Sequence, residues 1–549
     1  MRKLFILLII FSTAAAHAQS HEDTLRLLRQ TAALYDLDFT NAEADSMIGN
    51  IVNWKRAYGR LHEQLPANDI PFPFAFQPAP YGFPIPKGQQ MINWNIPNDV
   101  ALPANREDLA FYSIMQLASL IKNKKISSVA LTEFFLNRLK KWGDTLESVI
   151  TITEELALQE ARQADEEISR GQYRGPLHGI PYGLKDLFAV KGYKTTWGST
   201  PYMNQVVDEN AYVYTKLKEA GAVLCAKLSL GALAYNNKWF GGETKNPWKL
   251  DEGSSGSSAG SAASVVAGLL PFTLGTETLG SIVSPSTRCG ATGLRPTFGT
   301  ISRSGAMVLS WSLDKAGPIC RSAEDDAIVY YYIKGTDGKD ASAVDHAFNY
   351  NPNGDVKKLR FAYAENYFNR LPKTAPEWQV LEEYKKMGVE LEPVNFPDSM
   401  IYGSLVSIIL NAESAAAFDE LTRTNRDDLI ERQDKAFWPN SFRASRLIPA
   451  VEYINANRYR TQLMERMQQF MKEYDVVITP TFAGSQLSAT NLTGNPVVCM
   501  PIGFSKAGTP LSITLVGNLY DEASILQAAK AYQDQTDHNK KHPAPFYKN

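Results

Sequence analysis

The stretch Gly253–Ser281, GSSGSSAGSAASVVAGLLPFTLGTETLGS, is the most informative part of this chain. It holds seven serines among glycines and alanines, and it ends in a serine that follows a glycine. A buried helix gains little from so many serines, because their hydroxyl groups compete with the helix for backbone hydrogen bonds. The stretch is therefore expected to carry chemistry, with its serines as candidate nucleophiles.

A nucleophilic serine needs a base, and no histidine lies between His178 and His346. Residues 256–260, GSSAG, match the G-x-S-x-G pattern of α/β-hydrolases, which require an acid and then a histidine further along the chain. In a run this rich in serine and glycine the match is weak evidence. The downstream histidines, His346, His538 and His542, lie in a loop-like stretch and in the polar tail. A conventional Ser-His-Asp hydrolase stays an alternative.

The strongest candidate for the base is Lys185, which closes an apolar strand in GPLHGIPYGLKD, residues 175–186. Burial penalises the charged ammonium and lowers the pKa of a lysine. A fall of about 3 pKa units, roughly 4 kcal/mol, would make it a neutral base near pH 7.5. A buried ion pair with Asp186 is the alternative of equal weight. In the same stretch, His178 is expected to form structural hydrogen bonds in a turn.

Three segments in this order resemble the amidase signature family: GPLHGIPYGLKD at 175–186, GSSGSSAGSAASVVAG at 253–268 and LGTETLGSIVSPSTRCGATGLRPTFG at 274–299. The resemblance runs from about residue 109 to 531. It implies an α/β fold with a mixed, largely parallel, twisted sheet covered by helices. It also implies that Lys185 is the base, that Ser257 is a proton relay next to a cis peptide bond, and that Ser281 is the nucleophile.

The resemblance further implies how a tetrahedral intermediate is held. In an oxyanion hole, loss of one hydrogen-bond donor typically costs about 3–4 kcal/mol. The family's oxyanion loop corresponds here to the backbone N–H groups of Thr278, Leu279, Gly280 and Ser281. Supporting roles, in hydrogen bonding to the relay or in shaping tight turns, fall to Ser258, Thr276 and Gly256.

Two positions depart from the commonest form of the family. Leu279 stands where a second glycine is usual, and Val283 stands where an arginine is usual. Because backbone donors survive a change of side chain, the chemistry is expected to be intact, while Leu279 is expected to narrow the mouth of the pocket. The form TETLGSIV at 276–283 resembles the peptide-amidase branch, which suggests C-terminal amides of peptides as substrates.

The composition is that of a globular enzyme, with 44% hydrophobic residues, 21% charged residues and a formal net charge of −2. The absence of any block of like charge argues against a nucleic-acid partner. The sequence shows neither zinc-ligand spacing nor a phosphate-binding G-x-x-x-x-G-K-[ST] loop, so neither a metal nor another cofactor is expected. The four cysteines are expected to be core thiols: Cys225, Cys289, Cys320 and Cys499.

The N-terminus resembles an export signal. Arg2 and Lys3 precede an apolar run over 4–16, and Ala16-His17-Ala18 forms an A-x-A cleavage site. Residues 1–18 are therefore expected to be a signal peptide cleaved after Ala18, which makes the protein periplasmic or secreted; an uncleaved anchor is the alternative. The run is too short to span a bilayer comfortably, so no stable membrane insertion is expected.

The rest of the chain divides into three expected parts. Residues 19–64 are expected to form a small helical appendage, with helices near 23–35 and 41–61, the second opening in a capping box over 40–43. Residues 65–105 form a proline-rich connector, whose aromatic side chains are expected to lie against the catalytic domain. The catalytic domain is assigned to residues 106–549.

Helix and strand patterns alternate in the catalytic domain, as in an α/β fold. Helices are expected from 127 or 128 to 142 and over 154–170, the latter stopping at Gly171. Residues 357–474 are expected to be mostly helical and to decorate the sheet; Asn411, Glu413 and Phe418 there are either pocket contributors or, preferably, parts of a scaffold helix. Strands are expected at 149–153, 223–226, 272–274, 360–363, 476–479, 497–501 and 511–516.

We therefore expect a serine amidohydrolase that cleaves a small-molecule or peptide amide through an acyl-enzyme on Ser281 and releases ammonia or an amine. One alternative is the glutaminase subunit of an amidotransferase, whose partners charge tRNA in the cytosol; the expected signal peptide argues against it. Another is a non-catalytic binding protein that keeps the pocket. The sequence leaves open whether the chain forms a homodimer.

Overall fold

The computed structural model describes residues 21–35, 37–63, 68, 70 and 74–547. The chain divides into two compact units, Met1–Ala67 and Asn68–Asn549. The expected signal peptide over 1–18 lies outside the described residues. Among the helices that the structure describes, none is both long enough and apolar enough to cross a membrane.

The smaller unit contains two helices, α1 (His21–Ala33) and α2 (Asn41–His62), which pack against each other. Helix α2 starts where a capping box is expected. The backbone N–H of Glu43 donates to Thr40 Oγ1 over 3.3 Å, and the backbone N–H of Thr40 donates to Glu43 Oε2 over 2.8 Å. These bonds satisfy N–H groups that a helix start leaves without an intrahelical partner, and they confirm the expected beginning of this helix.

The proline-rich segment after Asn68 runs along the larger unit. Gln89 exchanges two hydrogen bonds with the backbone of Phe348, donating from Nε2 over 2.8 Å and accepting at Oε1 over 2.9 Å. The ring of Trp94 packs on Tyr331 and Tyr350. The expected contact with the larger unit is thus confirmed for Trp94, and also for Phe76 and Phe83, whose rings pack on Phe298 and Tyr520. Tyr81 is exposed, and Phe72 lies outside the described residues.

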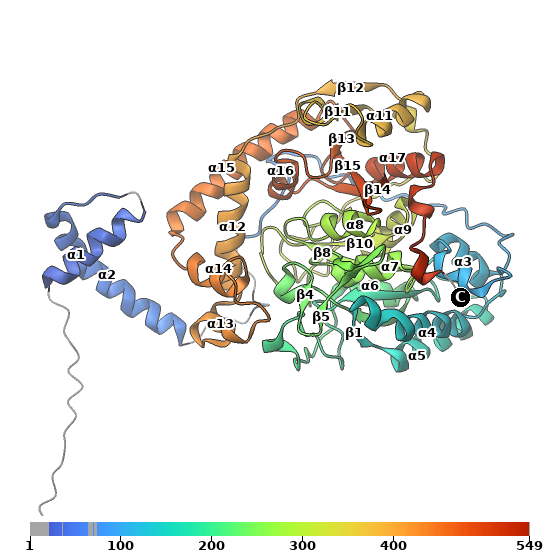
Figure 1. Ribbon diagram of the computed structural model, residues 1–549, viewed down its shortest axis with the longest axis horizontal. Helices are drawn as coiled ribbons and strands as arrows, with labels where there is room; N and C mark the ends of the chain where they lie inside the picture. The colour runs from blue at the N-terminus through green and yellow to red at the C-terminus, as the bar shows by residue number, and fades with distance from the viewer. Residues whose placement is uncertain (1–20, 36, 64–67, 69, 71–73, 548–549) are drawn as a thin grey trace, which may run out of the picture. The chain divides into compact units, whose positions relative to one another are not determined.

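An eleven-stranded mixed sheet forms the core of the larger unit, in the order β1-β3-β2-β8-β10-β9-β14-β15-β13-β11-β12 (Figure 1). Two short hairpins lie outside it, β4 (Lys238–Trp239) with β5 (Gly242–Glu243), and β6 (Lys245–Asn246) with β7 (Lys249–Gly253). The strands of the sheet are β1 (Val149–Ile152), β2 (Pro181–Lys185), β3 (Val223–Leu228), β8 (Phe272–Glu277), β9 (Thr292–Arg295), β10 (Lys315–Cys320), β11 (Phe361–Ala364), β12 (Leu391–Val394), β13 (Val476–Pro480), β14 (Val497–Phe504) and β15 (Pro510–Gly517).

The parallel strands of this sheet gather in two blocks. Strand β2 pairs in parallel with β3 and β8, and β11 pairs in parallel with β12 and β13. Antiparallel pairs join the two blocks through β10, β9, β14 and β15. The expected mixed sheet and its expected strands are confirmed. Strands β9, β10 and β12 were not expected, because short stretches with internal glycine, proline or charge show no clear apolar run.

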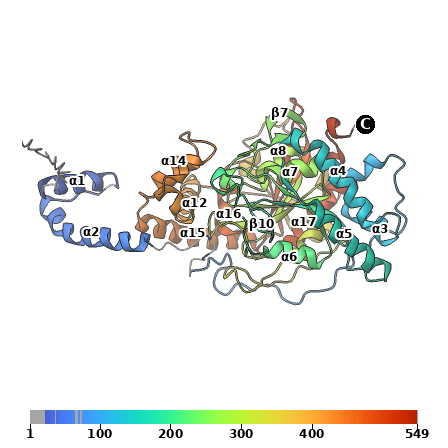
Figure 2. The ribbon, with the colours of Figure 1, turned by 90° about the horizontal axis from the view of Figure 1, so that it is seen from below.

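Helices cover both faces of the sheet. Figure 2 shows α7 and α8 on one side of β10 and α6 on the other. The helices of the larger unit are α3 (Ile114–Lys122), α4 (Ser128–Leu146), α5 (Glu154–Ser169), α6 (Tyr212–Glu219), α7 (Ala259–Val266), α8 (Val283–Cys289), α9 (Ala323–Ile333), α10 (Glu365–Phe368), α11 (Glu377–Lys386), α12 (Ile401–Ala417), α13 (Asp419–Arg423), α14 (Trp438–Ser445), α15 (Ala450–Met471), α16 (Gln486–Thr493) and α17 (Glu522–Gln535).

The serine-rich stretch serves the core as well as the site. Every residue of α7 is buried, and its small side chains let the helix lie close to β8 and β10. Ser261 Oγ donates to the Leu274 carbonyl over 2.9 Å, and Thr273 Oγ1 donates to the Ser261 carbonyl over 3.0 Å. Because these hydrogen bonds join α7 to β8, burial of the two hydroxyl groups costs little. Part of the stretch is therefore a packing helix, contrary to the expectation drawn from its serines.

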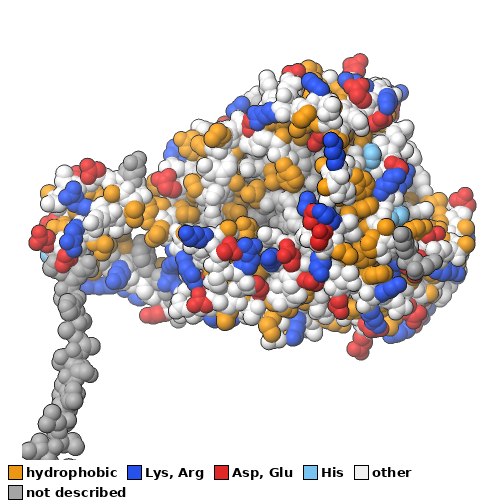
Figure 3. Space-filling view, in the orientation of Figure 1, with side chains coloured by type: hydrophobic (Ala, Val, Ile, Leu, Met, Phe, Trp, Pro, Cys, Tyr) orange, Lys and Arg blue, Asp and Glu red, His pale blue; other side chains and the backbone are white. Residues whose placement is uncertain are grey.

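Two further expectations for the larger unit are confirmed, the helical character of residues 357–474 and the burial of the cysteines. Residues 357–474 are mostly helical, and all four cysteines are buried and free. On the face that Figure 3 shows, acidic and basic side chains of the larger unit are interspersed. Within the part of the chain that the structure describes, no cluster of three His, Cys, Asp or Glu side chains could hold a metal ion.

Candidate active site

The site forms where two neighbouring parallel strands end. In the pairing of β2 with β8, Leu184 lies opposite Leu274, so Lys185 reaches the level of the residues that follow Leu274. Carboxyl ends of parallel strands share one edge of a sheet, where ligands commonly bind. The loop before α7 brings Ser257 to the same edge, and the loop after β8 carries Ser281. Residues far apart in the sequence thus meet at one point.

Lys185 Nζ lies at the centre of a group of hydroxyl oxygens. It is 2.8 Å from Ser257 Oγ, 2.9 Å from Thr276 Oγ1 and 3.2 Å from Ser258 Oγ. The Ser258 hydroxyl donates to the Thr276 carbonyl over 3.1 Å, so its oxygen can only accept from Lys185. A neutral amine has one lone pair and two N–H groups. With Ser258 accepting one N–H and Thr276 Oγ1 placed to accept the other, Ser257 is the hydroxyl that can donate to the lone pair.

Burial lowers the pKa of Lys185 from its ordinary value to about 7, although the nearby carboxylates of Asp314 and Glu277 raise it. The adjacent carboxylate does not pair with this lysine. Asp186 pairs instead with Lys227, with 2.6 Å between Oδ1 and Nζ, and both side chains are fully buried. The alternative of a Lys185–Asp186 ion pair is therefore wrong, and Lys185 can exist as a neutral amine close to neutral pH.

Ser257 follows the cis peptide bond Gly256–Ser257 that the family resemblance implies. A Cβ atom at Gly256 would lie 1.8 Å from the Asn236 carbonyl oxygen, so only glycine fits at this position. The Gly231 N–H donates to the Ser257 carbonyl over 3.3 Å. These contacts hold the Ser257 backbone against the turn over 231–236, with the side chain at Lys185.

Ser281 is joined to the relay segment through its backbone. Its carbonyl accepts a hydrogen bond from the Ser258 N–H over 3.1 Å, and Ser281 retains 8% of its surface exposed. Gly280, with φ at +83°, supplies the left-handed turn just before it. Among the described residues, the N–H groups of Leu279, Gly280 and Ser281 have no hydrogen-bond acceptor. The arrangement offers free backbone donors beside a serine, which an oxyanion hole requires.

Glu277 holds one side of this loop. Its carboxylate accepts hydrogen bonds from the N–H groups of Ile282 and Val283 over 2.9 and 3.0 Å, directly after Ser281. It also pairs with Arg295, with 2.8 Å between Oε1 and NH1, and both side chains are fully buried. Burial would raise the pKa of Glu277, but Arg295 and Lys315 outweigh burial and hold this pKa at about 2. Glu277 is therefore a permanent negative charge that fixes the start of α8.

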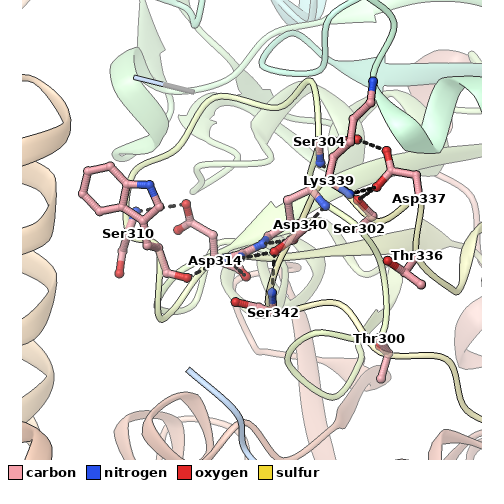
Figure 4. A network of polar contacts seen from close by, with 12 residues as sticks. Thr300, Ser302, Ser304, Ser310, Asp314, Thr336, Asp337, Lys339, Asp340 and Ser342 are labelled. Carbon is pink, nitrogen blue, oxygen red and sulfur yellow. Dashed lines mark hydrogen bonds and ion pairs between the residues drawn. The ribbon is translucent and has the colours of Figure 1, made fainter. Parts of the chain in front are cut away.

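Asp314 holds the other side of the loop. Thr278 Oγ1 donates to Asp314 Oδ1 over 2.6 Å, and Asp314 Oδ2 accepts from the N–H groups of Leu309 and Ser310 over 2.8 and 2.9 Å. Figure 4 shows Asp314 beside Ser310 and near Asp340, which pairs with Arg303 with 2.8 Å between Oδ2 and Nε. The segment 303–314 is thus tied to the loop that precedes Ser281.

Sequence reasoning missed Asp314, Lys227 and the role of Glu277. Glu277 lies in the stretch first quoted, and a carboxylate at the end of an apolar strand is a signal, because a buried charge needs a partner. Lys227 lies near the end of β3 much as Lys185 ends β2. Asp314 carries no such signal, because its partner Thr278 lies 36 positions away.

Other candidates lie away from this centre. His178 accepts from the Arg174 N–H over 3.1 Å, which agrees with a structural role, and His346 Nε2 lies 2.9 Å from the Tyr330 hydroxyl. The side chain of Leu279 is half-buried and packs against the hydrophobic cluster that contains Leu492. The expectation that Leu279 narrows the pocket mouth stays a prediction.

Glu413 holds the segment that contains Ser310 and Ser312. Its carboxylate accepts from Ser310 Oγ, from the Ser312 N–H and from the Ser312 hydroxyl over 2.5, 3.0 and 2.8 Å. Asn411 accepts from Ser441 Oγ over 2.8 Å, and Phe418 is buried on Phe442, which agrees with the preferred interpretation of a scaffold helix.

Comparison with known proteins assigns the family. A sequence model described as Amidase matches residues 130–489. The chain belongs to the amidase family. It is 35% identical over 488 residues to a glutamyl-tRNA(Gln) amidotransferase subunit from Acinetobacter baumannii (strain AYE), covering 80% of this chain and 98% of the relative. It is 31% identical over 483 residues to the corresponding subunit from Thioalkalivibrio sulfidiphilus (strain HL-EbGR7), covering 79% and 99%.

Solved structures agree with this amidase assignment. The peptide amidase of Stenotrophomonas maltophilia superposes with a TM-score of 0.70 at 27% identity, covering 78% of this chain and 98% of that one. The expected fold, a mixed sheet covered by helices as in amidase signature enzymes, is shown by this similarity and by the architecture described above. The chain is an enzyme of a family that acts on amide C–N bonds.

Proposed function

We propose that this amidase hydrolyses a carboxylic amide to the acid and ammonia or an amine through an acyl-enzyme on Ser281. The observation that carries the proposal is the buried contact of 2.8 Å between Lys185 Nζ and Ser257 Oγ, together with the backbone bond between Ser258 and Ser281. No histidine is needed for this scheme, because a neutral lysine and a hydroxyl group take its place.

Acylation begins with two proton transfers. Lys185, neutral near pH 7, accepts the proton of Ser257, and Ser257 in turn accepts the proton of Ser281. Ser281 Oγ forms a bond to the amide carbon, and the carbonyl oxygen becomes an oxyanion. The free N–H groups of Leu279, Gly280 and Ser281 are placed in the loop that would stabilise this charge, and Thr278 completes the proposed hole.

Collapse of the intermediate breaks the C–N bond. The proton held by Lys185 returns through Ser257 to the departing nitrogen, which leaves as ammonia or an amine. Water then attacks the ester on Ser281 by the same relay and releases the acid. Ser258 and Thr276 keep Lys185 oriented through the contacts of 3.2 and 2.9 Å, and neither needs to change its protonation.

A direct test compares two serines of the same stretch. Ser281→Ala is expected to lower kcat for amide hydrolysis by at least about a thousandfold, since it removes the nucleophile. Ser264→Ala is the matched control, because the hydrogen bond of Ser264 Oγ goes to Ser148 Oγ over 3.1 Å and not to a residue of the proposed relay. Unchanged turnover in Ser281→Ala would rule out the proposed nucleophile.

A second candidate function is favoured by one observation, the 35% identity to a subunit of an amidotransferase. Such a chain would hydrolyse glutamine and pass ammonia to a partner. Glutamine turnover by the purified chain, measured beside a set of aliphatic, aromatic, peptide and fatty amides, separates the two. Turnover confined to glutamine would replace simple amide hydrolysis by the glutaminase function.

Export is part of the proposal, on the evidence of the sequence over 1–18. Mass spectrometry of the mature chain should find its first residue at Gln19, in a periplasmic or secreted fraction. A chain that keeps Met1 and stays in the cytosolic fraction would contradict export and favour the amidotransferase role.

A further inference from the structure

A cavity of about 80 Å³ lies beside the end of β8. It is bordered by residues after β2, by the end of β8 with Thr276 and Thr278, and by the segment before β10. Most of its wall is apolar, including Leu187, Phe188, Met307, Leu309 and Trp311.

Five charged side chains border the cavity: Arg303, Asp314 and Asp340 have the partners given below, Lys315 Nζ donates to the Leu313 carbonyl, and Lys339 is exposed to solvent. Arg303 pairs with Asp340 through two contacts of 2.8 and 3.0 Å, and Arg303 also donates to the backbone carbonyl of Trp311 over 2.8 Å. Asp314 accepts from Thr278 and from two backbone N–H groups. A ligand in this cavity therefore meets mainly apolar surface, which favours an apolar group over a charged one.

The cavity lies on the side of the base and the relay. Leu187 and Phe188 follow Lys185 in the chain, and Thr276 Oγ1 is 2.9 Å from Lys185 Nζ. Ala234, also in the wall, belongs to the turn whose Gly231 N–H binds the Ser257 carbonyl. The cavity therefore borders residues that contact Lys185 or closely follow it in the chain.

The proposed proton transfer places the departing nitrogen on the side of Ser257 and Lys185. When the C–N bond breaks, the nitrogen must take its proton from Ser257, and Lys185 then gives its proton to Ser257. The nitrogen and its substituent therefore face the relay. A primary amide releases ammonia and leaves such a cavity empty, whereas an N-substituted amide fills it.

We propose that the substrate is an N-substituted amide whose leaving amine carries an apolar group, and that this group binds in the cavity beside Lys185. The inference rests on the proposed amide hydrolysis and names the class of its substrate. The balanced acylation step joins the acyl carbon to Ser281 Oγ and releases the amine with the proton that Ser281 had carried.

The test uses three amides of one acid, hexanamide, N-methylhexanamide and N-benzylhexanamide, with the full-length enzyme. Benzylamine is less basic than methylamine and so the better leaving group, and the Ala306→Phe variant described next separates this effect from binding of the ring. We expect kcat/KM for the N-benzyl amide to exceed that for the N-methyl amide at least about tenfold. Equal values, or a preference for hexanamide, would overturn the inference while amide hydrolysis stands. No hydrolysis of any amide would instead remove the proposed function.

The variant Ala306→Phe tests whether the preference for the N-benzyl amide arises in this cavity. Ala306 lines the cavity and is only half-buried, so Ala306→Phe projects a ring into the space without filling the core. Its kcat/KM for the N-benzyl amide should fall at least about tenfold more than its kcat/KM for hexanamide. Ala375→Phe, at a half-buried position outside the cavity wall, is the matched control and should change neither value. Equal loss on both amides in Ala306→Phe would contradict a leaving-group site.

Discussion

The protonation state of Lys185 is expected to set the pH dependence of the reaction. Burial lowers its pKa to about 7, and only the neutral amine can accept a proton. We therefore expect kcat/KM to rise with pH through about 7 and to fall about tenfold per pH unit well below it. Initial rates from pH 5 to pH 9 measure this profile. A flat profile over that range would exclude Lys185 as the titrating base.

Glu277 provides a second prediction at the level of one residue. In Glu277→Gln the buried guanidinium of Arg295 loses its charge partner, which typically costs about 3–5 kcal/mol of unfolding free energy. Chemical denaturation measures this difference. Glu420→Gln is the control, because Glu420 faces Arg426 over 3.4 Å with both side chains exposed, where a pair is worth at most about 1 kcal/mol. Equal effects of the two substitutions would contradict the assigned role of Glu277.

At the scale of elements, the loop between β8 and α8 is held by Glu277 on one side and Asp314 on the other. Thr278→Val removes the hydroxyl that donates to Asp314 over 2.6 Å. Since a small displacement of oxyanion donors weakens transition-state binding, kcat should fall about 10–100-fold with KM nearly unchanged.

The control for this loop variant is Thr461→Val, which removes an exposed helical hydroxyl whose bond goes to Asn457 in the same helix. It should leave both kinetic constants unchanged. A rise in KM without loss of kcat in Thr278→Val would show that Asp314 shapes substrate binding rather than the oxyanion loop.

The arrangement of the elements also explains which parts of the fold and of the site could be predicted from the sequence. Lys185, Ser257 and Ser281 lie in local patterns, and the structure places Lys185 at Ser257 and ties the Ser281 backbone to Ser258. The strands with apolar runs were also predictable. Asp314 and Lys227 were not, because their partners are set by strand order rather than by neighbouring residues. The packing of Leu279 against the cluster with Leu487 likewise depends on where α16 lies.

At the scale of the whole molecule, every candidate site residue belongs to the unit Asn68–Asn549. Asn68 itself anchors this unit, since its side chain exchanges hydrogen bonds with the backbone of Val308 over 3.0 and 3.1 Å. A chain that starts at Asn68 should therefore keep its fold and kcat/KM within about twofold of the full chain.

A chain that also lacks the proline-rich connector is expected to be less stable than the chain that starts at Asn68. A chain that starts at Arg106 lacks Gln89 and Trp94, and it exposes the apolar surface under them. It should unfold at a lower denaturant concentration than the chain from Asn68. Equal stability of the two truncated chains would show that the connector adds nothing to the larger unit.

The central claim is that Ser281 is the nucleophile, and covalent labelling tests it most directly. The purified enzyme is treated with a fluorophosphonate probe, and the modified peptide is identified by mass spectrometry. The account predicts one label on Ser281, absent from Ser281→Ala and slowed in Lys185→Met, in which no base remains. A label on another residue, or full labelling of Ser281→Ala, would contradict it.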